Sequence, residues 1–591
     1  MKLRPVLSLL MIVALSLCAF ARPVPDSPAR ARKQREQVTA FVNVNVVTME
    51  RDEVLPNRTV IVREGRISQI GPTASTKIPA GAQRLDGQGK YLMPGLVDMH
   101  VHLHSTLEFP LYLANGVTTV YNLNGRPAHL AWRDRVARGE LIGPTIYTCG
   151  PTIRSAQTAA EARQLVEEQA RAGYDSIKIY NGVSTEAYET LIAEAKRHNL
   201  LYVGHIPRAP GLEGVLKAGQ AIAHAEEYIY TFFHNKVDDE SRIPEAAAMT
   251  RDAHVPVILT LVAYEHILQQ ATDLRALLAR PETKYLAPWI EESWEPGGNP
   301  YEKFFGNEKG RADLARAFAF QKKLVQELHR DGVRVMVGTD AMNPGVVPGF
   351  SVHEELRHLV SIGFTPFEAL RAATAYPADF LRGSSEFGTV TVGKRADLML
   401  VEGNPLKDVS TAAHPVGVMA RGRWLPSREL ARMLADVPVR YAKQLQAGRS
   451  SFERDPLKAL QEMKTDDAFD DLSNTVVQGF VVEKGTARFR ELFALLKERS
   501  ADSPLVSEAY INGLGYSLMG RGKMKEAIDI FKLNTETYPA SANTYDSLAE
   551  AYMNNGEREL AIKFYRRALE VDPKYANAEG AMQALKKLEE K

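Results

Sequence analysis

The sequence predicts a mixed α/β protein of several domains, with a closed barrel of eight parallel strands at its centre and a helical domain at its C-terminus. Three observations predict this fold class. Eight short β-rich runs alternate with amphipathic stretches over about 280 residues, which is the pattern and span of a (β/α)8 TIM barrel. Short strands flank that region on both sides, and a helical pattern recurs with a period of 34 residues near the C-terminus.

The barrel is predicted to occupy residues 93–385. Its candidate strands are Leu96–Val101, Val117–Asn122, Thr145–Cys149, Ser176–Tyr180, Tyr202–His205, Ala221–His224, Val255–Leu261 and Val333–Asp340. Alternation alone leaves open a doubly wound open sheet, because periodicity does not show whether the sheet closes. Residues 263–331 are too long for a simple connection, so they form either a lid at the barrel mouth or extra helices on its outside.

Segments rich in short strands lie on either side of the barrel. Residues 38–92 contain runs such as Thr59-Val60-Ile61-Val62, punctuated by Gly65 and Gly71. Residues 386–427 return to the same pattern, for example in Ala396–Val401. These two segments lie outside the alternating pattern of the barrel, so they are predicted to form additional β-structure.

The C-terminal region contains an internal repeat. A shift of 34 residues superposes Leu514 on Leu548, Ala527 on Ala561, Phe531 on Tyr565 and Pro539 on Pro573. This period and pattern are those of tetratricopeptide (TPR) repeats, whose concave surface suits a peptide or protein partner. Residues 508–591 are therefore assigned to these repeats and 428–507 to a helical linker region. Because fewer than three repeats are rarely stable alone, we expect the linker to pack against them.

The N-terminus is predicted to be a secretory signal peptide over residues 1–21, followed by a disordered lead-in over 22–37. Two basic residues precede a short apolar run, and Ala19-Phe20-Ala21 is a typical cleavage site. The alternatives are a membrane anchor, for which the run is short, and lipoprotein processing at Cys18. The expected location is periplasmic or secreted, with no transmembrane anchor after cleavage.

Composition argues against several classes of function. The formal net charge is +1, so no strong field favours a nucleic acid partner. Cleavage after Ala21 would leave Cys149 as the single cysteine, which excludes an intramolecular disulfide. The sequence contains no G-x-S-x-G elbow, which argues against a Ser-His-Asp hydrolase.

Five of the predicted barrel strands end in potential metal ligands. These are His100, His102, Lys178, His205, His224 and Asp340. Each taken singly could be a satisfied core residue or a helix N-cap. Together they predict a divalent metal site at the C-terminal end of the barrel, where barrel enzymes have their active sites, and imidazole with carboxylate suits zinc.

Two of these positions are informative by themselves. His100 and His102 are two residues apart on a strand and point to the same face, so both imidazoles can reach one ion in the lumen. Lys178 lies between two isoleucines in a buried strand, where a charged amine is costly unless it is paired or modified.

Three motifs resemble those of the metal-dependent amidohydrolase superfamily. They are Met93-Pro94-Gly95-Leu96-Val97-Asp98-Met99-His100-Val101-His102, Gly338-Thr339-Asp340-Ala341 and residues 388–398. The resemblance covers residues 38–427 and is strongest to the prolidase- and imidazolonepropionase-like branch, especially its members acting on Xaa-Pro or Xaa-Arg dipeptides. It implies that 38–92 and 386–427 form one composite β-sandwich beside the barrel.

The resemblance also implies a binuclear centre with two divalent ions, zinc being the expected metal. By resemblance, His100, His102 and Asp340 bind the more buried ion and His205 and His224 bind the other. Lys178, carboxylated by CO2, bridges them. Two features depart from the commoner family pattern and leave the substrate class open: Ile206-Pro207-Arg208 follows His205, and the 263–331 segment is long.

This ligand set implies hydrolysis of a C–N bond in a small substrate, such as a dipeptide or an N-acyl amino acid. Two cations on one water lower its pKa and hold a hydroxide, and Asp340 can act as the catalytic proton shuttle. Tyr228 and Arg208 are candidates to hold a substrate carboxylate. The alternatives are a cyclic amide or lactone hydrolase, and a catalytically degenerate barrel that serves the repeats as an interaction scaffold.

N-terminal sequencing of the protein from its native host tests the signal peptide. We expect a mature N-terminus at Arg22 and no lipid on Cys18, because signal cleavage follows small residues such as Ala21. A mature chain that begins at Cys18 and carries lipid would contradict this expectation.

Overall fold

The structure is a computed structural model that describes residues 38–288, 294, 299–343, 345–455, 458–459, 469–499, 504–573, 575 and 577–589. The predicted signal peptide of residues 1–21, with Cys18, and the lead-in of 22–37 lie outside the described residues, as does part of the 263–331 insertion. Among the helices that are described, none is both long enough and apolar enough to cross a membrane.

Eight parallel strands close into the predicted barrel. They are β6 (Leu96–Val101), β7 (Val117–Asn122), β8 (Thr145–Thr148), β10 (Ser176–Val183), β11 (Leu201–Gly204), β12 (Ala221–Ala223), β13 (Val257–Leu259) and β14 (Val335–Val337). The ladders β6–β8 and β10–β14 are joined by parallel bridges between Cys149 and Ser176 and between Val101 and Ala341. The sheet is therefore a closed barrel and not a doubly wound open sheet.

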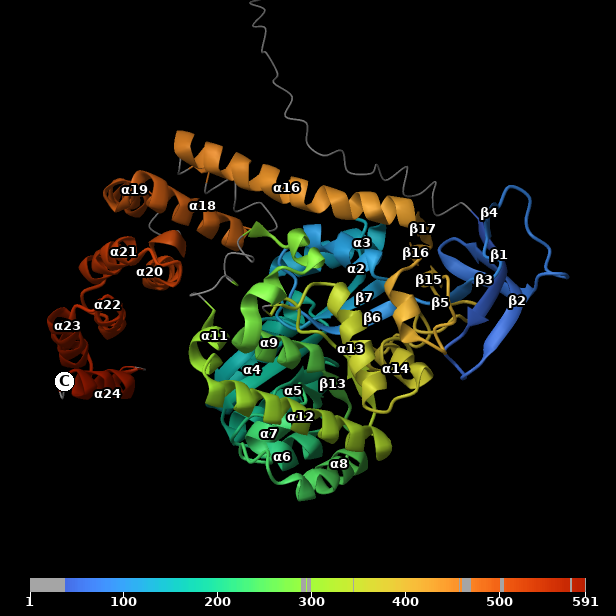
Figure 1. Cartoon of the computed structure of the whole chain (residues 1–591), viewed down its shortest axis with the longest axis horizontal. Coiled ribbons are helices and arrows are strands. Elements are labelled where there is room, and N and C mark those ends of the chain that lie inside the picture. Colours follow the sequence, from blue (N-terminus) through green and yellow to red (C-terminus); the bar gives the residue numbers. More distant parts are fainter. Residues whose placement is uncertain are drawn as a thin grey trace, which may run out of the picture.

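Helices cover the outside of the barrel (Figure 1). They include α3 (Pro127–Arg138), α4 (Ala159–Ala172), α5 (Thr185–Arg197), α6 (Gly211–Ala218), α8 (Ile243–Asp252), α13 (Phe350–Ser361), α14 (Pro366–Ala372) and α15 (Ala375–Phe380). Local sequence explains α5: Ser184 caps its N-terminus by accepting a hydrogen bond from the Ala187 N–H, and its apolar face, including Leu191 and Ala195, is buried. One extra strand, β9 (Ile153–Ala156), follows β8 and pairs with β10.

The flanking segments form one eight-stranded sheet. Its strands are β1 (Thr39–Val47), β2 (Val54–Arg63), β3 (Arg66–Pro72), β4 (Gln83–Asp86), β5 (Tyr91–Pro94), β15 (Leu398–Val401), β16 (Gly417–Ala420) and β17 (Arg423–Pro426). β5 pairs with β15 and so joins the two segments. The rings of Phe41 on β1 and Trp424 on β17 lie 5.2 Å apart, although four strand spacings of a flat sheet would separate them by about 19 Å. The sheet therefore curls over its own core, as a sandwich does.

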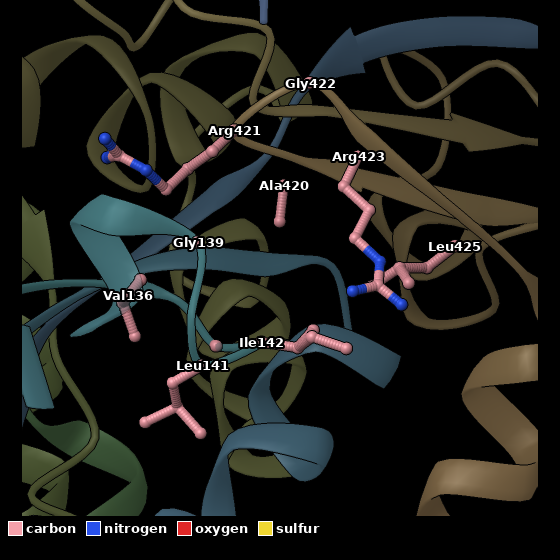
Figure 2. A pocket seen from close by; sticks show the side chains of 10 residues that line it. Val136, Gly139, Leu141, Ile142, Ala420, Arg421, Gly422, Arg423 and Leu425 are labelled. Atoms are coloured by element: carbon pink, nitrogen blue, oxygen red, sulfur yellow. The ribbon is translucent and has the colours of Figure 1, made fainter. Parts of the chain in front are cut away.

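The sheet and the barrel meet at an apolar junction, shown in Figure 2. Leu141 and Ile142, before β8, lie opposite Ala420 and Leu425 of the β16–β17 hairpin. The hollow between them has a volume of about 50 Å³, room for one or two waters but not for a substrate. This contact is structural.

The long insertion after β13 is mostly helical where it is described. It contains α9 (Leu261–Leu278), the 3₁₀ helix η3 (Pro281–Tyr285), α11 (Pro300–Phe305) and α12 (Glu308–Arg330). The buried carboxylate of Glu355 on α13 accepts hydrogen bonds from the Leu261 and Val262 N–H groups, at 3.1 and 2.7 Å. This carboxylate satisfies the free N–H groups at the start of α9 and anchors the insertion to the barrel.

The C-terminal region is all helical and forms an arm beside the barrel (Figure 1). It contains α16 (Ser427–Arg454), α18 (Phe469–Lys484), α19 (Thr486–Arg499), η5 (Pro504–Val506), α20 (Glu508–Gly520), α21 (Met524–Thr537), α22 (Ala542–Asn554), α23 (Arg558–Val571) and α24 (Ala578–Glu589). α18 packs on α20 and α19 on α21, so the linker helices contact the repeats directly.

One hydrophobic cluster connects this arm to the barrel. Val437 and Tyr441 of α16 belong to the same buried cluster as Leu111, Leu286 and Trp294, which lie near the C-terminal end of the barrel or in the insertion. The cluster continues through α18 into the repeats. The arm therefore covers apolar side chains that the barrel would otherwise expose.

Truncation after residue 427 tests this connection. We expect the shortened protein to keep every predicted metal ligand but to unfold at a lower temperature, because burial of each large apolar side chain contributes about 1.5–3 kcal/mol. Calorimetry and metal analysis measure both properties. A chain cut after residue 507 keeps α16 and is the control; equal unfolding temperatures for both truncations would contradict the prediction.

Candidate metal centre

The first and last strands of the barrel supply the closest group of side chains. His100 lies in β6 and His102 just after it, while Asp340 follows β14. Asp340 Oδ1 lies 3.2 Å from His100 Nε2 and 2.9 Å from His102 Nε2. The three residues offer ligand atoms that all lie within 4.8 Å of one another. This spacing is compatible with one ion at metal–ligand distances of about 2.0–2.2 Å.

The other three candidates extend this group across the lumen. Lys178, in β10, has its Nζ 2.9 Å from His100 Nε2. His224, directly after β12, has its ring centroid 4.5 Å from that of His100, and His205, directly after β11, lies 4.9 Å from His224 by the same measure. The structure therefore brings all six sequence-predicted residues together at the C-terminal end of the barrel.

Burial determines the protonation of these side chains. It lowers the pKa of His100 and His224 well below the usual range and also lowers the pKa of Lys178. Burial alone would raise the pKa of Asp340, but the neighbouring histidines outweigh it and hold that pKa well below its usual value. Neutral imidazoles beside an ionised carboxylate are the donor set that a divalent cation requires.

Three hydrogen bonds within the barrel orient the candidate ligands. Asp98 accepts from the Thr339 N–H at 3.0 Å and from the Thr339 hydroxyl at 2.6 Å, which ties β6 to the loop that carries Asp340. His224 Nδ1 lies 2.9 Å from the Thr260 hydroxyl, so its Nε2 is left to face the lumen. Such partners fix the orientation of a ligating side chain.

A carboxylate supports His205 from behind. Glu227 Oε1 lies 2.6 Å from His205 Nδ1, and its Oε2 accepts from the Ile206 N–H at 3.0 Å. The contact is an ion-pair distance and not an aligned hydrogen bond, but a carboxylate beside one imidazole nitrogen still makes the other nitrogen a stronger metal ligand. Glu227 was not singled out by the sequence analysis, although its position three residues after His224 was visible there.

Two of the candidate ligands have left-handed backbone conformations. The φ angle is 78° at His224 and 58° at Asp340. Backbone hydrogen bonds hold both: His224 N–H donates to Ile258 O at 2.9 Å, and Asp340 N–H to His100 O at 2.8 Å. Strained backbone that the surrounding structure maintains is typical of functional sites.

The candidate ligands open into a cavity of about 990 Å³. Five of the six candidates reach the surface of the cavity: His102, Lys178, His205, His224 and Asp340. His100 is fully buried beneath them. The insertion supplies part of the wall through residues that include Tyr264, Ile267, Tyr301, Phe305, Leu314 and Arg316. The insertion thus lines the cavity, and it also contributes α12 to the helices outside the barrel. The sequence had left these two arrangements open as alternatives.

The two residues proposed to hold a substrate carboxylate are not part of this cavity. Tyr228 is fully buried and forms a 2.9 Å hydrogen bond with the Thr250 hydroxyl, because its position on a short helix points it into the core. Arg208 is exposed and does not line the cavity. Arg154 of β9 does line it, with its guanidinium carbon 5.4 Å from the centroid of the Tyr180 ring.

Comparisons with known proteins agree with this geometry. An amidohydrolase family model matches residues 315–425, and a tetratricopeptide repeat model matches residues 542–575. The adenine deaminase of Paracoccus denitrificans is 28% identical over 419 residues, which are 66% of this chain and 58% of that protein. The imidazolonepropionase of Pseudomonas putida is 24% identical over 389 residues, 61% of this chain and 92% of that protein.

The family model and the relatives together support placing the chain in the amidohydrolase superfamily. The predicted superfamily, fold class and C-terminal repeats are thereby confirmed. This amidohydrolase spans a little over half the length of the adenine deaminase that it matches. A solved Xaa-Pro dipeptidase has the same barrel fold, with a TM-score of 0.53 and 20% identity over 66% of this chain and 100% of that one.

Glu227→Gln tests the support of His205 in this amidohydrolase. Loss of a carboxylate behind a ligating imidazole lowers metal affinity about 10- to 100-fold, and we expect a change in that range. Metal titration by calorimetry measures it. Glu213→Gln, the same change at an exposed position of α6, is the control. Equal affinities in Glu227→Gln and the parent protein would disprove the role of Glu227.

Proposed function

We propose that the protein is a binuclear metal-dependent hydrolase that cleaves a C–N bond in a small substrate such as a dipeptide or an N-acyl amino acid. The observation that carries this proposal is the convergence of four imidazoles, Asp340 and Lys178 at the C-terminal end of the barrel, beside a cavity large enough for such a substrate. The superfamily supports it, since several of its related members act on C–N bonds.

The residues present fit two divalent ions, with zinc best suited to the ligand types. His100, His102 and Asp340 would hold the more buried ion, and His205 with His224 the other. The depressed pKa values of His100 and His224 leave their imidazoles neutral, and no proton has to be displaced from them.

Lys178 fits the bridging role only after modification. An ammonium 2.9 Å from His100 Nε2 would repel a nearby cation. Burial lowers the pKa of Lys178 and so favours the neutral amine. That amine can attack CO2, forming an N–C bond and releasing one proton, and the resulting carbamate has two oxygens and a negative charge.

Divalent ions held by these residues would lower the pKa of a water toward neutrality and would polarise the substrate carbonyl. Asp340, which is ionised, takes a proton from the attacking water and passes it to the leaving nitrogen as the C–N bond breaks. Arg154, at the cavity wall, is placed to pair with a substrate carboxylate. The cavity walls hold the substrate while this proton is transferred.

Hydrolysis of a cyclic amide or a related ring is the second candidate. It is favoured by the similarity to an imidazolonepropionase, whereas the similarity to a Xaa-Pro dipeptidase favours the linear substrate. A degenerate scaffold is disfavoured, because a barrel without activity has no need of six converging ligands.

Export to the periplasm or the exterior, and a peptide or protein partner on the repeats, complete the proposal. The first rests on the signal-like N-terminus, and the second on the tetratricopeptide match. A screen of dipeptide, N-acyl amino acid and cyclic amide libraries with zinc- or manganese-loaded protein tests the activity. Turnover of cyclic amides alone would replace the first candidate by the second.

Lys178→Ala tests the binuclear centre. We expect this variant to bind at most one metal tightly and to lose activity by orders of magnitude, because the bridging anion is gone. Short carboxylic acids should restore part of the activity by entering the space left by the side chain. Asp340→Asn is the companion variant: it should abolish turnover while the fold survives. Two tightly bound ions in Lys178→Ala, or near-normal turnover in Asp340→Asn, would overturn the corresponding role.

A further inference from the structure

Glu226 presents an unsatisfied carboxyl group to the cavity. Its Oε1 lies 3.6 Å from Nδ1 of His224, a nitrogen already hydrogen-bonded to Thr260. Its Oε2 is buried and has no hydrogen-bond partner among the described residues. A buried carboxyl oxygen without a partner is costly, and the Glu226 side chain also reaches the surface of the cavity, where a cationic ligand would compensate the carboxyl group.

Three tyrosines share the cavity wall with Glu226: Tyr230 of α7 (Glu227–Thr231), Tyr264 of α9 and Tyr301 of α11. Burial and then the charge of Glu226 raise the pKa of Tyr230 and Tyr264. The pKa of Tyr301 is also raised, mainly by burial and then by the charges of Asp340 and Glu226. The three rings and the Glu226 carboxyl group therefore line the same cavity. Aromatic rings beside a carboxylate are the combination that binds an organic cation.

The other carboxylates of the wall are already engaged. Asp313 forms an ion pair with Arg316, which also lies 3.9 Å from Asp238, and Glu227 contacts His205. The positive group of the wall, Arg154, lies over Tyr180, whose ring centroid is 4.1 Å from that of His205. The described part of the cavity thus has a cationic group near one side of the candidate ligands and a carboxyl group beside His224.

We propose that Glu226, Tyr230, Tyr264 and Tyr301 form a subsite for the α-ammonium group of a dipeptide, with Arg154 facing its carboxylate. The inference rests on the proposed function, which admits both dipeptides and N-acyl amino acids, and it selects the free dipeptides. An N-acylated substrate presents a neutral amide at this position and cannot pair with the carboxylate.

The place of Glu226 selects the α-ammonium over a side-chain cation. Because Glu226 lines the same cavity as the candidate ligands and lies two residues from His224, a cation bound there lies near the candidate metal centre. In a dipeptide, a single Cα separates the α-ammonium from the scissile carbonyl carbon. The ammonium of a lysine or the guanidinium of an arginine lies several bonds farther away.

The test compares a dipeptide that the metal-loaded protein hydrolyses with its N-acetyl derivative. In the parent protein, kcat/KM for the free dipeptide should be higher by about 10- to 100-fold, the usual effect of a hydrogen bond to a charged group. Glu226→Gln should remove most of this preference and leave the N-acetyl derivative within about twofold. Tyr230→Leu, at a half-exposed position, should reduce the preference in part, and Glu213→Gln should leave it unchanged.

Equilibrium binding gives a second readout. A ketomethylene isostere of the dipeptide, with a free amine, should bind Glu226→Gln more weakly than the parent protein by a similar factor in calorimetry, at equal metal content. Equal loss for free and acetylated ligands would show that Glu226 has only a structural role and would overturn the subsite. If the protein hydrolyses neither the free dipeptide nor its N-acetyl derivative, the proposed function is wrong. Binding of the isostere would still decide whether the subsite exists.

Discussion

The site depends on the closure of the barrel between its first and last strands. The parallel bridge between Val101 and Ala341 joins β6 to the end of β14, and the Asp340 N–H donates to the His100 carbonyl at 2.8 Å. This one contact places the Asp340 carboxylate between His100 and His102, although 238 residues of sequence separate His102 from Asp340. Without closure the two strands would be opposite edges of an open sheet, and the ligands could not meet.

Closure has an electrostatic consequence. It buries two imidazoles, an amine and a carboxylate in one lumen, where each charged form is costly unless it is compensated. The result is neutral His100 and His224 around an ionised Asp340, and the lone pairs of these groups can bind a cation. Positive φ at His224 and Asp340 indicates that the backbone is strained to aim these donors inward.

The parts added to the barrel determine access rather than chemistry. The insertion after β13 contributes Tyr264 and Tyr301 to the cavity wall, and Glu355 fixes its beginning to the barrel. The helical arm covers apolar residues of the insertion and of the loops near the C-terminal end of the barrel, including Trp294 and Leu286. A partner bound to the repeats would therefore act on a unit that is continuous with the wall of the cavity.

The sequence by itself determined the alternation of strands and helices, the 34-residue repeat and all six candidate ligands, because each is a local pattern: polar residues at the ends of apolar strands, or a fixed period. Only the tertiary structure decided which other side chains face the substrate. Tyr228 and Tyr230 are two residues apart on α7, yet the first bonds to Thr250 in the core and the second lines the cavity. The packing of that short helix sets its rotation, and the approach of β9 and α11 brings in Arg154 and Tyr301. Such contacts depend on distant segments that meet only in the folded chain, so no local sequence pattern predicts them.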